Sequence, residues 1–436
     1  MLPHLTGEHP TVVIANVSEP ALDFLNTAQP ADLPALIRGR QVKSERAVLW
    51  AGDPKLVILS LPTTLTPQQV GFTQTQIAVP ANPTASLCAD IQRDPQLIAH
   101  IKDFAGPSQT VQLIPYATTP AFYRLVGALR AEHGLRVHTP ESPAEADLWV
   151  HRHIDSKAGF RSLVGAWCPP GALPDGVICQ SLPEIMDAVG WLHRGGRDVF
   201  IKPDRGQSGI GMVLDAQSAD PTVLRTRLAD NPYLQQMPVV VEAAVPSTGE
   251  SPSLEYFIPQ TGDPILTYAC DQVVSPEGMF YGVLVSREVD ESPWYPAFAA
   301  LGNTIARGLQ AMGYVGHFDI DAIVDESRRP VLLEVNARRT GGTHVHEFAS
   351  YWVGPDYPQQ VTLLSHDSLP TGPIRAPDAL FDLLDGLLFD GQSYGIVPTI
   401  TATVPQGKFG CIAVAPTADD ALDLQQEVLS RCAVRA

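Results

Sequence analysis

Apolar residues recur along this chain at two spacings, and the dominant spacing changes from one region to the next. In the first third, short apolar runs predict buried strands at 11–15, 56–59 and 111–115. The last run leads into a predicted helix, with Thr119 as N-cap and Pro120 in its first turn. Strands that alternate with helices are typical of a mostly parallel sheet, so residues 1–150 are expected to form an α/β domain.

The remaining chain divides into two further regions. Residues 151–365 are expected to form mainly strands and hairpins, with one helix from Phe298 to Met312 that Gly313 ends. Residues 366–436 open with a Pro- and Gly-bearing linker, and a small α+β domain is expected there. Its predicted elements are a helix with leucines on one face at 380, 383, 384, 387 and 388, strands at 396–404 and 408–414, and a final helix capped by Thr417 and Asp420.

Composition narrows the class of protein. The chain has 436 residues and a formal net charge of −18, and no basic stripe interrupts it, which argues against binding to nucleic acid. Neither a long apolar run nor a signal-peptide layout is present, so a cytoplasmic protein without a membrane span is expected. Six cysteines without a C-x-x-C pair indicate free thiols in a reducing compartment.

A glycine-rich loop between two apolar strands is the first feature with chemical meaning. Gly206, Gly209 and Gly211 follow Lys202, which lies on the incoming strand. Glycines let backbone N–H groups approach phosphate oxygens, and the ammonium can meet phosphate charge. The spacing matches neither a Walker A loop nor the Rossmann G-x-G-x-x-G. An ordinary tight hairpin with a surface lysine is the alternative.

A second hairpin, 318–336, carries acidic and amide side chains inside apolar strands. Glu334 and Asn336 are two apart and face the same way, and Asp321 lies on the partner strand. These oxygen ligands suit Mg²⁺ that bridges nucleotide phosphates, whereas burying them unpaired would be costly. A solvated strand face is the alternative.

Two further segments flank this hairpin. Arg338, Arg339, Thr340, Gly341 and Gly342 follow it directly and predict an anion cradle, with a structural turn as the alternative. Upstream, the apolar strand 238–241 ends in Glu242 and small residues, which could present backbone groups to an adenine edge. A buried strand that meets a loop is the alternative there.

Taken in order, Phe-Ile-Lys-Pro, the glycine loop, Val-Val-Val-Glu and Asp…Glu-Val-Asn-Ala-Arg resemble the ATP-grasp superfamily of ligases over about 155–350. The resemblance implies a core of two α+β subdomains that hold ATP between them. The unit before this core and the small domain after it make the layout most similar to the peptide ligases of pheganomycin biosynthesis. Such ligases have a pre-ATP-grasp domain, the core and a C-terminal domain.

The resemblance also implies roles for individual residues. ATP and two Mg²⁺ ions are the expected cofactors, with Asp321, Glu334 and Asn336 as metal ligands and Lys202 and Arg338 as catalytic cations. Expected substrate contacts are Arg339, Thr340, Gly341, Gly342 and His346. Expected nucleotide contacts are Lys157, Lys202, Gly206, Gln207, Ser208, Gly209 and Gly211, then Glu242, Ala244 and Val245 at the adenine, Glu250 or Ser251 at the ribose, and Arg287.

The implied reaction joins a small carboxylate to an amine or a peptide N-terminus through an acyl phosphate, in a possible homodimer. Two alternatives use the same fold: an ATP-binding regulatory protein without catalysis, and a small-molecule kinase. The complete set of Lys202 and three metal ligands favours an enzyme. A zinc hydrolase is a third interpretation, since His151 and His153, and His344 and His346, each have strand spacing, but no G-x-S-x-G or H-E-x-x-H accompanies them.

Overall fold

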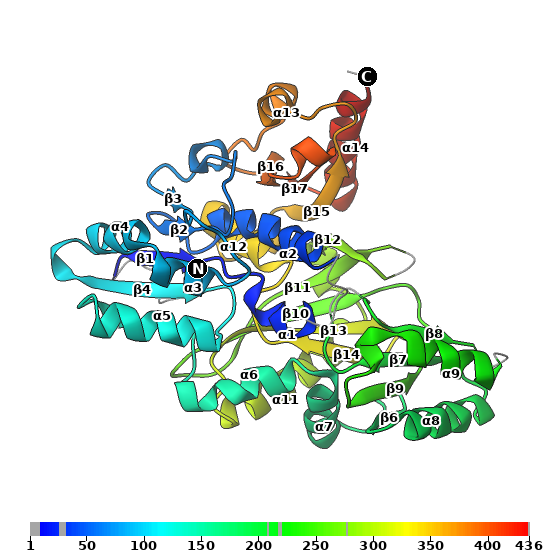
Figure 1. Ribbon diagram of the computed structural model, residues 1–436. Helices are drawn as coiled ribbons and strands as arrows, with labels where there is room; N and C mark the ends of the chain where they lie inside the picture. The colour runs from blue at the N-terminus through cyan, green and yellow to red at the C-terminus, as the bar shows by residue number, and fades with distance from the viewer. Residues whose placement is uncertain (1–8, 26–31, 207–208, 217–219, 276–277, 435–436) are drawn as a thin grey trace.

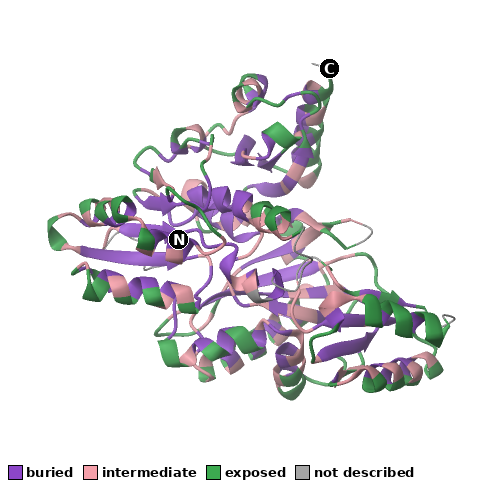
Figure 2. Ribbon diagram, in the orientation of Figure 1, coloured by how far each residue is buried: buried purple, intermediate pink, exposed green. Residues whose placement is uncertain are grey.

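The computed structural model describes residues 9–25, 32–206, 209–216, 220–275 and 278–434. Within these residues the strands form three sheets, and each sheet has helices against it (Figure 1). Buried side chains follow the sheets, and exposed ones follow the outer helices (Figure 2). No helix in the described part of the chain is long and apolar enough to span a membrane.

The N-terminal sheet is fully parallel, with strand order β3-β2-β1-β4-β5. Its elements are β1 (Thr11–Ile14), α1 (Leu22–Leu25), α2 (Leu33–Gln41), β2 (Leu56–Ile58), β3 (Gln76–Ala78), α3 (Leu87–Arg93), α4 (Pro95–Ala105), β4 (Thr110–Pro115), α5 (Pro120–Ala131) and β5 (Arg136–His138). The Thr119 hydroxyl accepts a hydrogen bond from the Phe122 amide at 3.1 Å and so caps α5. The α/β domain and this helix start are as predicted.

A four-stranded antiparallel sheet of order β6-β9-β7-β8 follows. Its apolar face packs on helices α8 and α9, and its other face carries Lys202 and Glu242 toward a cavity. The elements are α6 (Leu148–Ile154), α7 (Lys157–Trp167), β6 (Gly176–Cys179), α8 (Leu182–Arg194), β7 (Val199–Pro203), β8 (Val213–Asp215), α9 (Pro221–Asp230) and β9 (Val239–Ala243).

The largest sheet has eight antiparallel strands in the order β14-β13-β10-β11-β12-β15-β17-β16. Helix α11 buries Phe298, Ile305 and Leu309 against its β10 and β13 end. The elements are β10 (Pro252–Ile258), β11 (Ile265–Val274), β12 (Phe280–Val285), α10 (Arg287–Asp290), α11 (Tyr295–Ala311), β13 (Gly316–Val324), β14 (Pro330–Asn336), α12 (Thr343–Trp352), β15 (Thr362–Pro370), α13 (Pro377–Leu384), β16 (Gly395–Ile400), β17 (Lys408–Ala415) and α14 (Ala418–Val434).

This sheet runs without interruption from the middle of the chain into its C-terminal part. The expected boundary between 365 and 366 falls inside β15, which pairs with both β12 and β17, and the boundary between 150 and 151 falls inside α6. The division of the chain at these residues stays a prediction. Because β15 belongs to the same sheet as β13 and β14, the C-terminal segment continues the sheet of the core.

Four local predictions were wrong. Residues 151–365 contain α7, α8, α9 and α12 besides α11, and not one helix among strands and hairpins, because side chains such as Ser156 and Ser181 cap helix starts there. Helix α13 ends at Leu384, before Leu387 and Leu388, because Asp385 leaves the helical region and Gly386 takes a φ of +75°. Strand β16 ends at Ile400, because the next two amides, Thr401 and Ala402, donate to the buried Glu45 carboxylate at 2.7 and 2.8 Å. Both histidine pairs lie on helices, α6 and α12, where residues two apart point to different faces.

Candidate active site

A cavity of about 1030 Å³ lies between the four-stranded sheet, the β13–β14 hairpin and the N-terminal domain. Segments from all three regions line it, so the predicted residues meet although they are far apart in sequence. The predicted residues along its wall are Lys157, Lys202, Gly206, Gly209, Glu242, Val245, Glu250, Ser251, Asp321, Glu334, Asn336, Arg338, Thr340, Gly341 and Gly342.

Two lysines enter the cavity from different elements. Lys202 lies on β7, directly beside β9, and its ammonium pairs with the Glu242 carboxylate. Lys157 opens α7, whose N-cap Ser156 accepts a hydrogen bond from the Gly159 amide at 3.0 Å. Its Nζ lies 3.3 Å from Glu334 Oε2. Lys157 thus reaches a carboxylate of the β13–β14 hairpin, and Lys202 reaches one on the neighbouring strand of its own sheet. Phosphate oxygens in the cavity could replace both partners.

The β13–β14 hairpin places four oxygen-bearing side chains together. Asp321 is the cross-strand neighbour of Glu334, and Asp319 is the neighbour of Asn336. Asn336 Nδ2 donates to Asp321 Oδ2 at 3.1 Å, and the Gln272 amide donates to Asp321 Oδ1 at 2.5 Å. Asp319 was not predicted from the sequence, although its place two residues before Asp321 on one strand face indicates the same cluster.

The charges of these carboxylates differ although they are neighbours. Burial, together with the charge on Glu334, raises the pKa of Asp321 to about 7. Burial and the charge on Asp321 also raise the pKa of Asp319 well above its ordinary value. Burial acts in the same direction on Glu334, but the charges on Lys157, Lys202 and Arg338 outweigh it and lower the pKa of that carboxyl. Glu334 is therefore the carboxylate that stays ionised.

The hairpin suits a hard divalent cation that other ligands share. Carboxylate and amide oxygens are the donors that Mg²⁺ takes, usually with phosphate oxygens and waters besides one or two protein carboxylates. Asp319 Oδ1 is buried and has no hydrogen-bond partner among the residues that the structure describes. Nowhere in the described residues do three His, Cys, Asp or Glu side chains form a preformed cage. The residues fit Mg²⁺ that arrives with a nucleotide.

Arg338 connects the hairpin to the N-terminal domain. Its Nη1 lies 2.9 Å from Asp155 Oδ1, and its Nε donates to the Tyr116 hydroxyl at 3.2 Å. Asp155 also accepts from the Ala337 amide at 3.0 Å. Burial works to lower the pKa of Arg338, but Tyr116, Asp155 and Asp319 raise it above its ordinary value. Arg338 is thus a fixed cation, and the sequence did not predict Asp155 or Tyr116 as its partners.

Two solved structures share the fold of this chain over nearly their whole length. The ADP complex of N5-carboxyaminoimidazole ribonucleotide synthetase superimposes with a TM-score of 0.55 at 13% identity, covering 98% of this chain and 97% of that chain. Biotin carboxylase from Campylobacter jejuni, bound to a β,γ-ATP analogue, superimposes with a TM-score of 0.58 at 11% identity, covering 97% and 95%. The chain has the ATP-grasp fold. The architecture implied by the motifs is therefore confirmed.

One curated relative matches part of this chain. The L-propargylglycine–L-glutamate ligase of Streptantibioticus cattleyicolor is 24% identical over 294 residues, which are 61% of this chain and 60% of that ligase. The match therefore spans less than two thirds of the relative. Its name, a ligase of two amino acids, agrees with the expected likeness to peptide ligases. No protein-family model matches the chain.

Several predicted residues lie away from the cavity wall of this ATP-grasp core. Arg287 is exposed on α10 and pairs with Glu291 at 2.7 Å. A Cβ on Gly211 would lie 2.6 Å from Tyr233, so this glycine serves close packing. Ala244 is next to the lining residues Ala243 and Val245, and Gln207 and Ser208 lie outside the described residues. The binding roles of these residues stay predictions.

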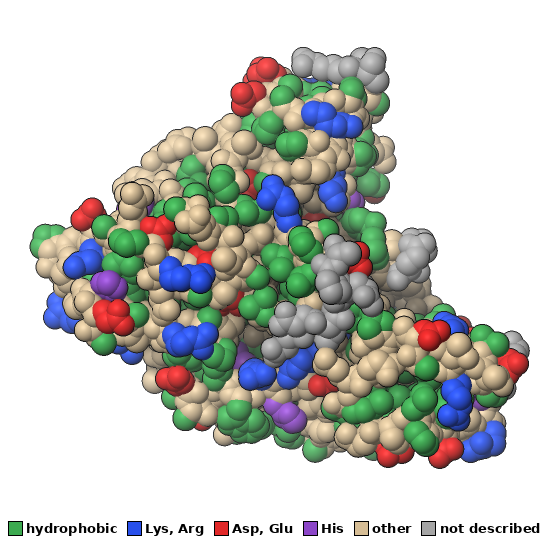
Figure 3. All heavy atoms as spheres, viewed as in Figure 1, with side chains coloured by type: hydrophobic (Ala, Val, Ile, Leu, Met, Phe, Trp, Pro, Cys, Tyr) green, Lys and Arg blue, Asp and Glu red, His purple; other side chains and the backbone are tan. Residues whose placement is uncertain are grey.

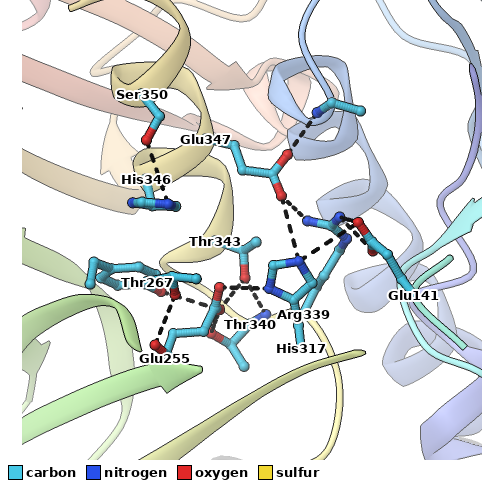
Figure 4. A network of polar contacts seen from close by, with 12 residues as sticks. Glu141, Glu255, Thr267, His317, Arg339, Thr340, Thr343, His346, Glu347 and Ser350 are labelled. Carbon is cyan, nitrogen blue, oxygen red and sulfur yellow. Dashed lines mark hydrogen bonds and ion pairs between the residues drawn. The ribbon is translucent and has the colours of Figure 1, made fainter. Parts of the chain in front are cut away.

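Arg339 and His346 belong to a buried polar network beside the cavity (Figure 4). The Arg339 side chain is 1% exposed and pairs with Glu141 of the N-terminal domain at 2.7 Å and with Glu347 of α12. His346 stacks on Tyr268, with ring centroids 5.1 Å apart. Both side chains thus contact other residues of the protein. Their contact with substrate stays a prediction.

The same network makes stability depend on pH through His317. Its Nδ1 lies 3.1 Å from Glu255 Oε1 (Figure 4). Burial and Arg339 work to lower the pKa of His317, but Glu141 and Glu255 raise it from 6.5 to about 9. Protonated His317 therefore stabilises the fold fully below about pH 6.5, and this contribution disappears as pH rises through about 9.

We expect the free energy of unfolding to fall by on the order of 3 kcal/mol between about pH 6.5 and pH 9.5 from this group alone. Urea unfolding of the wild type and of His317→Gln at both pH values measures it. The wild type should lose stability relative to the variant as pH rises. A constant difference between the two proteins would contradict the assignment.

Proposed function

We propose that this chain is an ATP-dependent carboxylate–amine ligase that forms an amide bond through an acyl phosphate. One observation supports the proposal most strongly: the lysine pair, the acidic hairpin and the anchored Arg338 line a single cavity in an ATP-grasp fold. The curated relative is a ligase, and the structural neighbours bind ADP or an ATP analogue. Nothing in these comparisons favours a kinase or a non-catalytic ATP-binding protein.

In the first step a carboxylate oxygen of the acid substrate attacks the γ-phosphorus of ATP. The bond to the β–γ bridging oxygen breaks, and ADP leaves with the electron pair. Lys157 and Lys202 would hold the phosphates, and Arg338 would neutralise charge on the phosphoryl group in transfer. Mg²⁺ held by Asp321, Glu334, Asn336 and Asp319 would supply further charge neutralisation.

In the second step the amine nitrogen attacks the acyl carbon, inorganic phosphate leaves and the nitrogen loses a proton. The acyl phosphate would hydrolyse in water, so the cavity has to exclude solvent during this step. Tyr116 and the Gly341–Gly342 turn form parts of the cavity wall beside Arg338, where the intermediate would form. We propose that an amino acid is at least one of the two substrates, joined to an amine or to a peptide N-terminus.

Nucleotide release tests this function. The protein would be given Mg-ATP with a pool of amino acids and short peptides, and ADP and AMP would be quantified separately. ADP that appears only when a carboxylate and an amine are both present is the expected result, and mass spectrometry would identify the product. AMP would contradict the proposal, because it indicates adenylation of the carboxylate.

The homodimer and the cytoplasmic location stay part of the proposal. A structural neighbour, the biotin carboxylase domain of Hydrogenobacter thermophilus 2-oxoglutarate carboxylase, is described as a dimer. All six cysteines are buried free thiols, as a reducing compartment would leave them. Scattered Lys and Arg side chains on the face drawn in Figure 3 form no stripe suited to nucleic acid.

A further inference from the structure

Three basic side chains of the N-terminal domain line the same cavity as the ATP-grasp motifs. Arg40 lies at the end of α2, and Lys43 and Arg46 lie on the 3₁₀ helix Val42–Leu49 that follows. A 3₁₀ helix has about three residues per turn, so side chains three apart lie one above the other. Lys43 and Arg46 therefore lie on one side of the 3₁₀ helix, and Arg40 at the end of α2 is close enough to act on the charge of Lys43. Together the three side chains form one basic ridge on the cavity wall, in a chain whose net charge is −18.

Two cations of the ridge, Lys43 and Arg46, share a single carboxylate. Asp367 of β15 pairs with both Lys43, at 3.3 Å, and Arg46. The Arg46 side chain is 8% exposed, and its Nε has no hydrogen-bond partner among the described residues. Nearby His344 adds no charge, because burial and Arg46 lower its pKa to about 3. A buried guanidinium nitrogen left without an acceptor, in the wall of a cavity, fits an anionic ligand that supplies the acceptor.

The adjoining wall also suits an anion, because α12 packs against the 3₁₀ helix that carries Lys43 and Arg46. Gly341 and Gly342 line the cavity directly before α12, which runs from Thr343 to Trp352. Amide groups at a helix N-terminus attract negative charge. Neither glycine could carry a side chain here, because a Cβ would lie 2.4 Å from Phe280 or 2.3 Å from the Tyr268 hydroxyl. The turn therefore presents its backbone on the cavity wall.

The ridge contacts other strands than the lysines expected at the nucleotide, because Lys43 and Arg46 pair with Asp367 of β15. Its first member, Arg40, is close enough to Arg338 for that charge, after burial, to help lower the pKa of Arg40 to about 10. Lys157 and Lys202 instead pair with Glu334 of β14 and Glu242 of β9. The two groups of cations therefore meet different strands around the cavity.

We propose that the Arg40–Lys43–Arg46 ridge and the Gly341–Gly342 turn bind a free carboxylate of an amino-acid substrate, one that is not phosphorylated in the reaction. This inference rests on the proposed ligase function and adds the requirement for a second anionic group. The carboxylate belongs to the acid substrate or to the amino acid that supplies the amine. Either source has the same chemistry at the ridge.

Calorimetric binding tests the proposal without turnover. L-glutamate and its α-carboxamide, L-isoglutamine, serve as acid probes, and L-alanine and L-alaninamide serve as amine probes, all with Mg²⁺ and a non-hydrolysable ATP analogue. We expect the free acid of at least one pair to bind about 10- to 100-fold more tightly than its amide, the usual effect of hydrogen bonds to a charged group. Preference within the glutamate pair indicates the acid substrate, and preference within the alanine pair indicates the amine substrate.

Lys43→Gln and Arg46→Met should each remove most of this preference, and Arg46→Lys should keep part of it. Arg38→Met is the matched control, because Arg38 is exposed on α2 outside the cavity wall. Binding of the ATP analogue should not change in any variant. The proposal is overturned if the wild type shows no preference, if Lys43→Gln keeps it, or if the variants weaken the ATP analogue equally. ADP release by the wild type, measured separately, tells failure of the ligase function apart from failure of this inference.

Discussion

Replacing Glu334 with glutamine is expected to lower kcat for ADP formation by roughly 10³-fold, because phosphoryl transfer depends on a complete set of charge-neutralising groups. Glu334 is the carboxylate of the hairpin that Lys157, Lys202 and Arg338 keep ionised. Glutamine keeps the shape of the side chain but removes the charge that would hold Mg²⁺ and orient Lys157. ADP release at saturating Mg-ATP measures the loss.

Glu326→Gln is the matched control for this variant. Glu326 lies in the turn of the same β13–β14 hairpin, is exposed, and is outside the cavity wall. Its rate should equal that of the wild type. Both variants should unfold at the wild-type temperature, which separates a catalytic effect from loss of the fold. Wild-type turnover in Glu334→Gln would refute the role of the hairpin as a metal site.

Replacing Arg339 with methionine is expected to lower the free energy of unfolding by about 3–5 kcal/mol, the usual cost of removing one partner from a buried ion pair. Arg339 pairs with Glu141 and Glu347, which are also buried. Without Arg339 the two carboxylates would share only the His317 ring among the described residues, at 3.8 and 3.9 Å. Because Glu141 belongs to the N-terminal domain and Glu347 to α12, the loss should loosen the attachment of that domain to the core. Urea unfolding measures the loss.

Arg329→Met provides the comparison for the arginine of the network. Arg329 also pairs with a carboxylate, Asp325, at 2.8 Å, but its side chain is 73% exposed. A surface pair of this kind contributes about 0–1 kcal/mol. Equal effects of the two substitutions would mean that the buried network adds no stability beyond an ordinary surface pair.

Local features of the site were predictable because their parts are close in sequence. The glycine loop and the β13–β14 hairpin each lie within one short segment, so alternation along a strand placed Glu334 and Asn336 on one face. The same reasoning applies to Asp319, which lies two residues before Asp321 and therefore on the same face of the strand. Capping residues such as Thr119 were equally local.

Contacts between distant segments were not predictable in this way. Tyr116 contacts Arg338, which is 222 residues away in the sequence, and Lys43 contacts Asp367, which is 324 residues away. A single sequence does not show which distant segments meet, so the basic ridge was not predicted. Arg339 was predicted to contact an anionic substrate because it follows Arg338 in the sequence. In the structure it is buried between Glu141 and Glu347, which are distant in sequence or on the next helix.

The proposed mechanism requires a carboxylate of the acid substrate to attack the γ-phosphate of ATP. Once ADP release has identified a substrate, that acid labelled with ¹⁸O in its carboxylate tests the claim most directly. An acyl phosphate transfers one labelled oxygen to inorganic phosphate when the amine displaces it, and mass spectrometry of the phosphate detects the transfer. We predict one ¹⁸O in phosphate for each amide formed. Label in AMP, or unlabelled phosphate beside a new amide, would contradict the account.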